Sequence, residues 1–526
     1  MTGRAASIPA TLRAIAARHA AREAIVDGKV RLTYAELDCG VIDACRGLIA
    51  MGVQPGDRVA IWAQNCWQWC VASLGISAAG AVIVPINTRF RGQEAARLVR
   101  DSGAVTLFTT VGFLGADYPD MLRQAAPSCG DLPTVVMTGD AAGKDLTWES
   151  FLGGGETVAE TEALERIDAV KTEDICDIMY TSGTTGISKG VVQTHGKNLL
   201  AMGSFAQALG LSPEDRNLVL APLFAQFGLR GGLYMDVMTG ATTILDSVFD
   251  PKRIFDVIER ERITTLPGPP TIMSALLSPN AAGRDLSSLR IAIMGSTVIP
   301  EDLVLGLLDN NVFDHVVTAY GLTEACGPVS VSALQDVPAQ IASFAGRVLK
   351  HLEIRVTAPD GNPVAPGERG ELLVRGATVM NGYLNDPELT AATIDEDGWL
   401  HTGDIGLVNS QGYVQITGRL KDMFIVGGFN VYPAEVEAAI REHESVRDVS
   451  LIGIPDDRLG EVGAAFIVCE PGHELDPQAL TGWCRGVLAN YKVPRVFVQL
   501  DEMPLNSSLK VDKLVLRRRL IVRPLP

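Results

Sequence analysis

The sequence lacks several features that would place it among zinc-binding, membrane or nucleic-acid-binding proteins. It has nine cysteines, but no CxxC pair and no His-Cys cluster with zinc-ligand spacing. Its most apolar stretch, residues 71–86, is short and is broken by Ser and Pro, so it does not suit a membrane span. Positive charge is also scarce, since 45 Lys and Arg face 62 Asp and Glu for a net charge of −17. We therefore expect a reduced, cytoplasmic protein with no nucleic-acid partner and no stable membrane insertion.

Length and hydrophobic patterning predict more than one domain and an α/β architecture. The chain has 526 residues, which is more than one hydrophobic core usually sustains. Thr33 and Glu36 form a capping-box pattern before a helical apolar period that ends near Gly52. The run RVAIWA, a helical segment to Gly80 and the run AVIVPI then alternate as strand, helix and strand. This alternation is typical of parallel sheets covered by helices, which we expect in a large N-terminal domain.

The chain changes character towards its C-terminus. After about Gly370 short strand-like runs and turns become frequent, and Pro433 begins an acidic-first helix that suits the helix dipole. We expect residues 1–420 to form the large domain and residues 421–526 to form a small, mobile α+β domain. Earlier in the chain, residues 139–173 are rich in Gly, Glu and Thr, which predicts a surface connection.

The run YTSGTTGISKG, residues 180–190, combines glycines, hydroxyl side chains and one lysine after the strand-like ICDIMY. Glycines allow backbone amides to approach a phosphate, hydroxyls donate to phosphoryl oxygens, and Lys189 adds a positive charge. The run is not a Walker A loop, because its end, Ser188-Lys189-Gly190, reverses that order. Taken alone, it favours phosphate binding but leaves a solvated Gly/Thr-rich turn open.

Four further motifs accompany this run: AYGLTEACGPVS (319–330), WLHTGDIG (399–406), GRLKDMFIVGGFNVYPAEVE (418–437) and PLNSSLKVDK (504–513). Together the five resemble the motifs of the acyl-adenylate-forming superfamily, in order and spacing, over about residues 31–516. The resemblance implies an acid:CoA ligase that uses ATP, Mg²⁺ and coenzyme A. Such an enzyme joins a small-molecule carboxylic acid to AMP, releases pyrophosphate, and then transfers the acyl group to the CoA thiol.

The resemblance also implies roles for single residues. Tyr320 is expected to stack on adenine, Glu324 to hold Mg²⁺, and Asp404 to accept hydrogen bonds from the ribose. In isolation, Glu324 could be an ordinary helix-start acid, and Asp404 with Arg419 a surface salt bridge. The expected catalytic residues are Lys510, Thr184, Glu324 and Lys189. The expected ATP-binding residues are Thr181, Ser182, Gly183, Thr185, Gly186, Gly295, Ser296, Tyr320, Gly321, Thr323, Asp404 and Arg419.

The predicted small domain contributes to both half-reactions. Lys510 matches the lysine that reaches the α-phosphate and the acyl carboxylate, where a fixed cation stabilises crowded negative charge. Leu509 stands where the family usually has glycine, which leaves the rate of adenylation open. The resemblance implies a hinge at Lys421, about which the small domain rotates between half-reactions. It also implies a CoA passage, or else a plain tight turn, at Gly427, Gly428 and Phe429.

Residues 221–232, APLFAQFGLRGG, resemble the acyl-pocket region of the family. Ala225 stands where histidine is common, which opens space, and Arg230 either meets a polar substrate group or lies at the surface. The expected pocket residues are Ala225, Gln226, Phe227, Gly228 and Arg230. A finer resemblance, in FDPKRIFDVIERERITTLPGPPT and PINTRFRGQEAARLVRDSGA, points to ligases of bulky cyclic propionates from steroid breakdown. Medium-chain fatty acids and aryl or cycloalkyl carboxylates stay open as substrates.

Three other functional classes share part of this pattern. A luciferase-like oxygenation shares the adenylation motifs but needs an oxidisable substrate. Another class is an adenylating enzyme that delivers its acyl group to a carrier protein. Members that activate amino acids usually have an aspartate near the position of Ala225, and this chain has none there. A degenerate nucleotide-binding homologue is motivated by Ala225 and Leu509, but the intact Lys189, Glu324 and Lys510 argue against it. A homodimer stays open, because interface patches do not show in one sequence.

Overall fold

The computed structural model describes residues 7–129, 131–181, 188–295, 299–427, 429–456, 458–505 and 511–522. The chain divides into two compact units. The first comprises Met1–Ile354, Val374–Leu400 and Gly412–Val414, and the second Arg355–Leu373, His401–Gln411 and Gln415–Pro526. Both units combine helices with sheets, so the predicted α/β class is confirmed. The predicted domain boundary after residue 420 stays a prediction.

One sheet of the first unit has the order β16-β15-β14-β13-β12-β10-β11-β1-β2. The strands from β14 to β1 in that order run parallel, whereas β2, β15 and β16 pair antiparallel at the two edges. The strands are β1 (Glu23–Asp27), β2 (Val30–Thr33), β10 (Arg216–Val219), β11 (Thr242–Leu245), β12 (Thr265–Pro267), β13 (Ile291–Gly295), β14 (His315–Leu322), β15 (Gly327–Val331) and β16 (Arg347–Val348).

A second sheet of the same unit has the order β19-β9-β8-β4-β3-β5-β6-β7. The runs RVAIWA and AVIVPI form its neighbouring parallel strands β3 and β4, as predicted, and β8 contains ICDIMY. The strands are β3 (Arg58–Trp62), β4 (Val82–Pro85), β5 (Ala104–Thr110), β6 (Thr134–Thr138), β7 (Leu146–Thr147), β8 (Ile175–Thr181), β9 (Lys189–Thr194) and β19 (Gly382–Tyr383).

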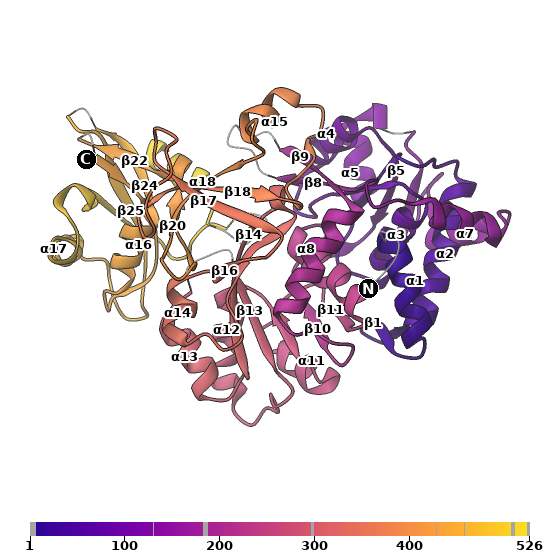
Figure 1. The fold of residues 1–526 in the computed structure, drawn as a ribbon, viewed down its shortest axis with the longest axis horizontal. Helices are drawn as coiled ribbons and strands as arrows, with labels where there is room; N and C mark the ends of the chain where they lie inside the picture. The colour runs from indigo at the N-terminus through magenta and orange to yellow at the C-terminus, as the bar shows by residue number, and fades with distance from the viewer. Residues whose placement is uncertain are drawn as a thin grey trace. The chain divides into compact units, whose positions relative to one another are not determined.

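Helices cover these two sheets, and α8 contacts β9 of one sheet and β15 of the other (Figure 1). In the described ranges, no helix has both the length and the apolar character that crossing a membrane requires. The helices of the first unit are α1 (Ile8–His19), α2 (Tyr34–Ala50), α3 (Trp67–Ala78), α4 (Gly92–Ser102), α5 (Tyr118–Ala125), α6 (Trp148–Gly155), α7 (Glu160–Ala169), α8 (His195–Ala208), α9 (Gln226–Gly228), α10 (Met235–Thr239), α11 (Arg253–Glu261), α12 (Pro270–Leu276), α13 (Glu301–Asp309), α14 (Pro338–Ser343) and α15 (Pro387–Thr393).

The surface connection predicted for residues 139–173 is wrong. This segment contains β7, α6 and α7, and it buries Trp148, Phe151 and Ile167. Its Gly- and Thr-rich composition does not by itself indicate a helix. Thr147 nevertheless caps the start of α6, because its hydroxyl accepts from the backbone N–H of Ser150 at 3.1 Å. The apolar side chains at helical spacing pack the segment against the core, whereas composition alone predicts a solvent-exposed connection.

Another sheet has the order β17-β18-β20-β21, and the second unit contains a sheet of order β23-β22-β25-β24 with β26 beside β25. Apolar side chains of β22, β24 and β25 pack against α16, which begins at Pro433 as predicted. The elements are β17 (Leu352–Thr357), β18 (Gly370–Gly376), β20 (Leu400–Val408), β21 (Val414–Arg419), β22 (Phe424–Val426), β23 (Phe429–Val431), β24 (Val446–Asp456), β25 (Gly460–Cys469), β26 (Val496–Gln499), α16 (Pro433–Arg441), α17 (Pro477–Val487) and α18 (Lys513–Val522).

Candidate active site

Several predicted site segments follow the carboxyl ends of parallel strands in the first unit. Strand β10 ends at Val219, just before residues 221–232, β13 ends at Gly295, and β14 contains Tyr320. These strands run parallel within one sheet, so their carboxyl ends meet at one edge. Ligands of open α/β sheets bind in the crevice at that edge. The topology therefore brings the predicted acyl segment and part of the predicted ATP site together.

The predicted phosphate loop connects two antiparallel strands, because β8 ends at Thr181 and β9 begins with its partner Lys189. A Cβ built on Gly190 would lie 3.3 Å from the ring of Tyr180, so the start of β9 packs closely on β8.

Some predicted residues lie outside the described ranges: Ser182, Gly183, Thr184, Thr185, Gly186, Ser296, Gly428 and Lys510.

Glu324 and Lys189 both contact Tyr383. Glu324 lies in the short 3₁₀ helix η5 (Thr323–Ala325), and the Tyr383 hydroxyl donates to its Oε1 at 3.0 Å. Nζ of Lys189 lies 5.2 Å from the centre of the Tyr383 ring, within cation–π range. Burial, followed by the charge of Glu324, raises the pKa of Tyr383, so the phenol keeps its proton and can donate.

Tyr383 is a site residue that the sequence motifs did not indicate. It lies on β19, which has only two residues and pairs with β9. The dipeptide Gly382-Tyr383 is too short to be distinctive, and only its pairing with β9 places the phenol beside Glu324. Among the described residues, Oε2 of Glu324 has no hydrogen-bond partner, so this oxygen is available to a hard cation such as Mg²⁺.

Two predicted glycines occupy positions with no space for a side chain. A Cβ on Gly321 would lie 2.1 Å from the carbonyl oxygen of Gly327, and a Cβ on Gly295 would lie 2.8 Å from that of Ala319. Close backbone approach thus accounts for both glycines, whether or not a ligand also lies there. The neighbouring Tyr320 is partly buried and packs against an apolar cluster of the first unit.

Thr323 is linked to the β8–β9 pair through its backbone. Nε2 of Gln193, on β9, donates to the carbonyl oxygen of Thr323 at 3.3 Å. Gln193 lies opposite Asp177 of β8, so the two side chains share one face of the sheet. This face contacts both η5 and the acyl segment.

The predicted acyl segment forms a short α-helix, α9, that continues into a π-helix, η3 (Leu229–Tyr234), and then into α10. Ala225 is the residue before α9, and Phe227 is partly buried. A Cβ on Gly228 would lie 2.2 Å from the carbonyl oxygen of Pro222, so the chain folds tightly back at this point. π-Helical turns are rare in proteins, and those that do occur are often at functional sites.

Arg230 is fully buried, so the alternative that it lies at the surface is wrong. Its Nη2 donates to Oδ1 of Asp177 at 2.6 Å, and the other carboxylate oxygen of Asp177 accepts from Asn198 at 2.8 Å. Burial by itself lowers the pKa of Arg230, but the attraction of Asp177 outweighs it and the pKa lies above its ordinary value. The guanidinium is therefore charged and is committed to a protein carboxylate.

The predicted ribose pair lies in the second unit. Nε of Arg419 donates to Oδ1 of Asp404 at 2.8 Å, and the Arg419 side chain is 46% exposed whereas that of Asp404 is 2% exposed. Arg419 therefore reaches the surface, whereas Asp404 is buried. Lys421 is exposed in the 3₁₀ helix η6 (Leu420–Asp422).

Gly427 follows β22 directly. It has a φ of +55°, and its N–H donates to the carbonyl oxygen of Leu459 at 2.9 Å. Phe429 begins β23. A role of either residue in CoA binding stays a prediction.

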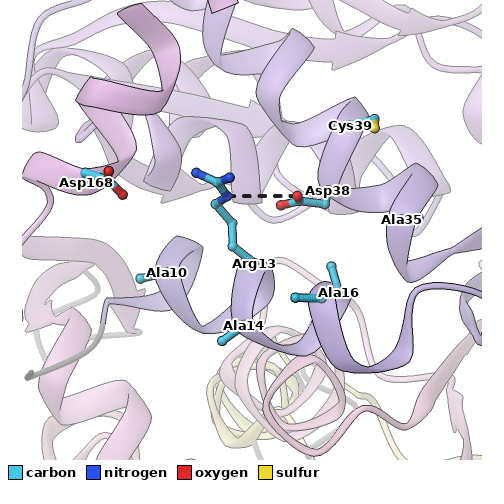
Figure 2. A pocket seen from close by; sticks show the side chains of 9 residues that line it. Ala10, Arg13, Ala14, Ala16, Ala35, Asp38, Cys39 and Asp168 are labelled. Carbon is cyan, nitrogen blue, oxygen red and sulfur yellow. Dashed lines mark ion pairs between the residues drawn. The ribbon is translucent and has the colours of Figure 1, made fainter. Parts of the chain in front are cut away.

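A hollow of about 500 Å³ lies apart from these residues, over α1 and α2 (Figure 2). Alanines line it together with Arg13, Asp38, Cys39 and Asp168, and Nε of Arg13 lies 4.0 Å from the Asp38 carboxylate. Burial and nearby acids raise the pKa of the Cys39 thiol, which makes it a poor nucleophile. None of the predicted site residues within the described ranges lines this hollow.

A sequence profile of the AMP-binding enzyme family matches residues 12–384, and the profile of the AMP-binding enzyme C-terminal domain matches residues 435–510. The chain belongs to the AMP-binding enzyme family. Over 98% of its length and 99% of the relative's, this AMP-binding enzyme is 42% identical to the 3-[(3aS,4S,7aS)-7a-methyl-1,5-dioxo-octahydro-1H-inden-4-yl]propanoyl:CoA ligase of Rhodococcus jostii (strain RHA1). It is 44% identical to the ligase of the same name from Mycobacterium tuberculosis (strain ATCC 25618 / H37Rv), over 97% and 98% of the two chains.

The AMP-binding enzyme also resembles solved structures of o-succinylbenzoate CoA synthetase from Bacillus subtilis, with 29% sequence identity. The complex with an acyl-adenylate intermediate has a TM-score of 0.82 and covers 95% of this chain and 96% of that one. The complex with ATP and magnesium ion has a TM-score of 0.80 and covers 95% and 98% of the two chains.

This AMP-binding enzyme is an AMP-forming acyl-CoA synthetase that uses ATP, Mg²⁺ and coenzyme A. A substrate carboxylate oxygen attacks the α-phosphorus of ATP, and the bond to pyrophosphate breaks. The CoA thiol, having lost its proton, then attacks the acyl carbonyl of the adenylate, and AMP leaves. The full-length relatives are CoA ligases, which supports CoA as the acyl acceptor over a carrier protein and active chemistry over a degenerate homologue.

Proposed function

We propose that this AMP-binding enzyme activates a bulky cyclic propionate with a fused-ring skeleton. The observation that carries the proposal is the identity of 42% and 44%, over almost the entire chain, to two ligases whose names specify a propanoyl group on a bicyclic indene-derived ring. The acyl segment is compatible with a wide substrate, because Ala225 stands where a larger histidine is common. A wide rigid acid needs such space more than a narrow chain does.

We further propose that the residue roles implied by the resemblance apply here. Lys189 and Lys510 would stabilise the negative charge that gathers at the phosphates and the carboxylate, and Glu324 would hold Mg²⁺ with phosphate oxygens as the other ligands. Bound Mg²⁺ would neutralise phosphate charge and help pyrophosphate leave. The same resemblance supports Asp404 and Arg419 at the ribose. It also supports two domains, residues 1–420 and 421–526, that exchange arrangements about Lys421.

The first experiment is to measure ATP-dependent pyrophosphate release and thioester mass with three acids. These are a bicyclic keto propionate, a medium-chain fatty acid and an aryl acid, each with and without CoA. We expect the highest kcat/KM with the bicyclic acid and no adenylation in Lys510→Ala. Thioester formation from only the fatty or aryl acid would refute the proposed substrate class, and full activity in Lys510→Ala would refute the role of that lysine.

The location and assembly of the enzyme are also proposals. We propose that it works in the cytoplasm, where ATP and CoA are supplied, and this agrees with the free thiols of all nine cysteines, which lie in the described ranges. We propose a homodimer as the assembly to test first. Light scattering at several concentrations would give twice the mass of the chain if this is correct, and the mass of one chain if it is wrong.

A further inference from the structure

The side chain of Gln226 accepts a hydrogen bond from Arg230, whose guanidinium is also paired with Asp177. Gln226 and Arg230 are four residues apart on a continuous helical segment, so they lie on one face. Nη1 of Arg230 donates to Oε1 of Gln226 at 3.4 Å, while Nη2 of the same guanidinium is bonded to Asp177. Asp177 is fully buried and accepts a second bond from Asn198, so the guanidinium has one stable position.

This contact decides which way the Gln226 amide points. A guanidinium has only donors, so the atom that faces it must be the amide oxygen. The amide nitrogen, Nε2, therefore points away from Arg230. Among the described residues Nε2 has no acceptor, and the side chain is only partly buried. The chain thus presents a fixed, unused hydrogen-bond donor at the acyl segment.

The donor is next to the end of the motif that contains Glu324. A Cβ built on Gly327 would lie 4.0 Å from Nε2 of Gln226 and 3.1 Å from Cε of Met202. Gly327 begins β15 and is separated from η5 by Cys326 alone. The free N–H groups of Gln226 therefore lie where the predicted acyl segment approaches the predicted adenylation motif, with an apolar side chain beside them.

We propose that Gln226 Nε2 donates a hydrogen bond to a carbonyl oxygen on the ring portion of the substrate, and that Arg230 positions Gln226 for this contact. The inference rests on the proposed function, because the ring ketones belong to the acid class of the two relatives. A ketone only accepts hydrogen bonds, so it matches an amide nitrogen and not the amide oxygen. A hydrocarbon ring would leave the donor unpaired, so the contact selects a keto acid.

The test compares two acids with the same bicyclic skeleton and propionate chain, one with ring ketones and one with methylenes in their place. Wild type is expected to prefer the keto acid in kcat/KM. Gln226→Leu removes the donor and keeps a similar volume. It should lower kcat/KM for the keto acid roughly tenfold, the loss of about one hydrogen bond, mainly through the KM of the acid. The methylene acid should change less than about twofold, and the KM of ATP should be unaffected.

Two further variants separate positioning from folding. Arg230→Lys keeps a positive charge for Asp177 but lacks the planar fork, so it should also reduce the keto preference while ATP binding is retained. Gln207→Leu, at an exposed position of α8, is the matched control and should leave both acids as in wild type.

Each outcome decides the inference. Equal losses for both acids in Gln226→Leu, or an unchanged keto preference, would overturn it while leaving the proposed function intact. If wild type forms no thioester from either bicyclic acid but does so from a fatty acid, the proposed function fails and the inference fails with it.

Discussion

Tyr383 controls how the carboxylate of Glu324 is presented. Its hydroxyl donates to Oε1, Oε2 has no partner within the part of the chain that the structure describes, and Lys189 lies over the face of the Tyr383 ring. Burial and the charge of Glu324 both raise the pKa of Tyr383, so the phenol acts as a donor at any pH at which the enzyme works. One neutral side chain thus orients an anion and contacts a cation of the predicted site.

Tyr383→Phe should therefore weaken MgATP-dependent adenylation. A hydrogen bond to a charged group contributes about 1.5–3 kcal/mol, so we expect kcat/KM for MgATP to fall by about tenfold or more. Pyrophosphate release as a function of MgATP concentration measures this. Tyr413→Phe is a matched control, because Tyr413 donates to Asp336 at 2.7 Å through the same kind of bond. Equal effects of the two variants would show that Tyr383 has no special role.

Some residue identities at the site could be predicted from the sequence, and their partners could not. Lys189 and Glu324 stand in motifs that are recognisable by order and spacing, and the fold brings them to one tyrosine. Asp177 is the partner of Arg230, but it is distant in sequence and lies in a strand that reads as apolar. Because a buried charge must find a partner through the tertiary fold, single-residue patterns do not reveal the pair.

The hairpin of β14 and β15 requires a glycine at position 321. Gly321 faces the backbone of Gly327, which cannot move aside as a flexible side chain could. We expect Gly321→Ala to lower the free energy of unfolding by about 1–3 kcal/mol, the usual cost of overpacking. Urea unfolding followed by circular dichroism measures the change.

Gly482→Ala provides the control for that variant. Gly482 is exposed in α17, and a Cβ there would have no neighbour within 4 Å. Alanine is a better helix former, so this variant should be about 0.5–1 kcal/mol more stable than wild type. If both variants are destabilised alike, the close contact at Gly321 is not the cause.

Elements with local signals could be predicted well. The capping box at the start of α2 is confirmed, since the backbone N–H of Thr33 donates to Oε2 of Glu36 at 2.8 Å and the Thr33 hydroxyl accepts from the Glu36 N–H at 3.2 Å. By contrast, composition does not predict α6 and α7, because the burial of Trp148 and Phe151 in α6 and of Ile167 in α7 depends on packing against other elements such as α2. Local patterns indicate where an element begins, whereas only the fold decides which faces are buried.

At the scale of the molecule, strand order could not be predicted from the sequence. The alternation of strands and helices predicts parallel sheets, but β1 pairs with β11, more than two hundred residues later. Such pairings depend on the whole chain and leave no local signal. The same holds for His195, the first residue of α8, whose Nδ1 accepts from the N–H of Ile8 at 3.5 Å across the core.

His195 should make the stability of the molecule depend on pH. Burial lowers the pKa of His195 to about 4, against the opposing charge of Asp174. The unfolded chain binds the proton near pH 6.5, so the stability from neutral His195 is complete above about pH 6.5 and decreases as pH falls towards 4. We expect this residue to account for a loss of roughly 2 kcal/mol between pH 7.5 and 5.0.

Urea unfolding at the two pH values, in wild type and His195→Asn, measures that contribution. The variant should be less stable than wild type at pH 7.5 but should lose less stability on acidification. His473→Asn, at an exposed site, should behave as wild type. The same acid sensitivity in His195→Asn as in wild type would rule out His195 as the source.

The buried pair of Arg230 and Asp177 affects how the substrate range of this enzyme can change in evolution. Loss of either partner alone leaves an uncompensated charge in the core, which typically destabilises a protein by about 3–5 kcal/mol. A lineage that departs from this pair must therefore alter both positions together or acquire compensating stability first. Gln226 has no such constraint, since its side chain is only partly buried. New acyl specificities should therefore arise through changes at position 226 while positions 177 and 230 stay paired.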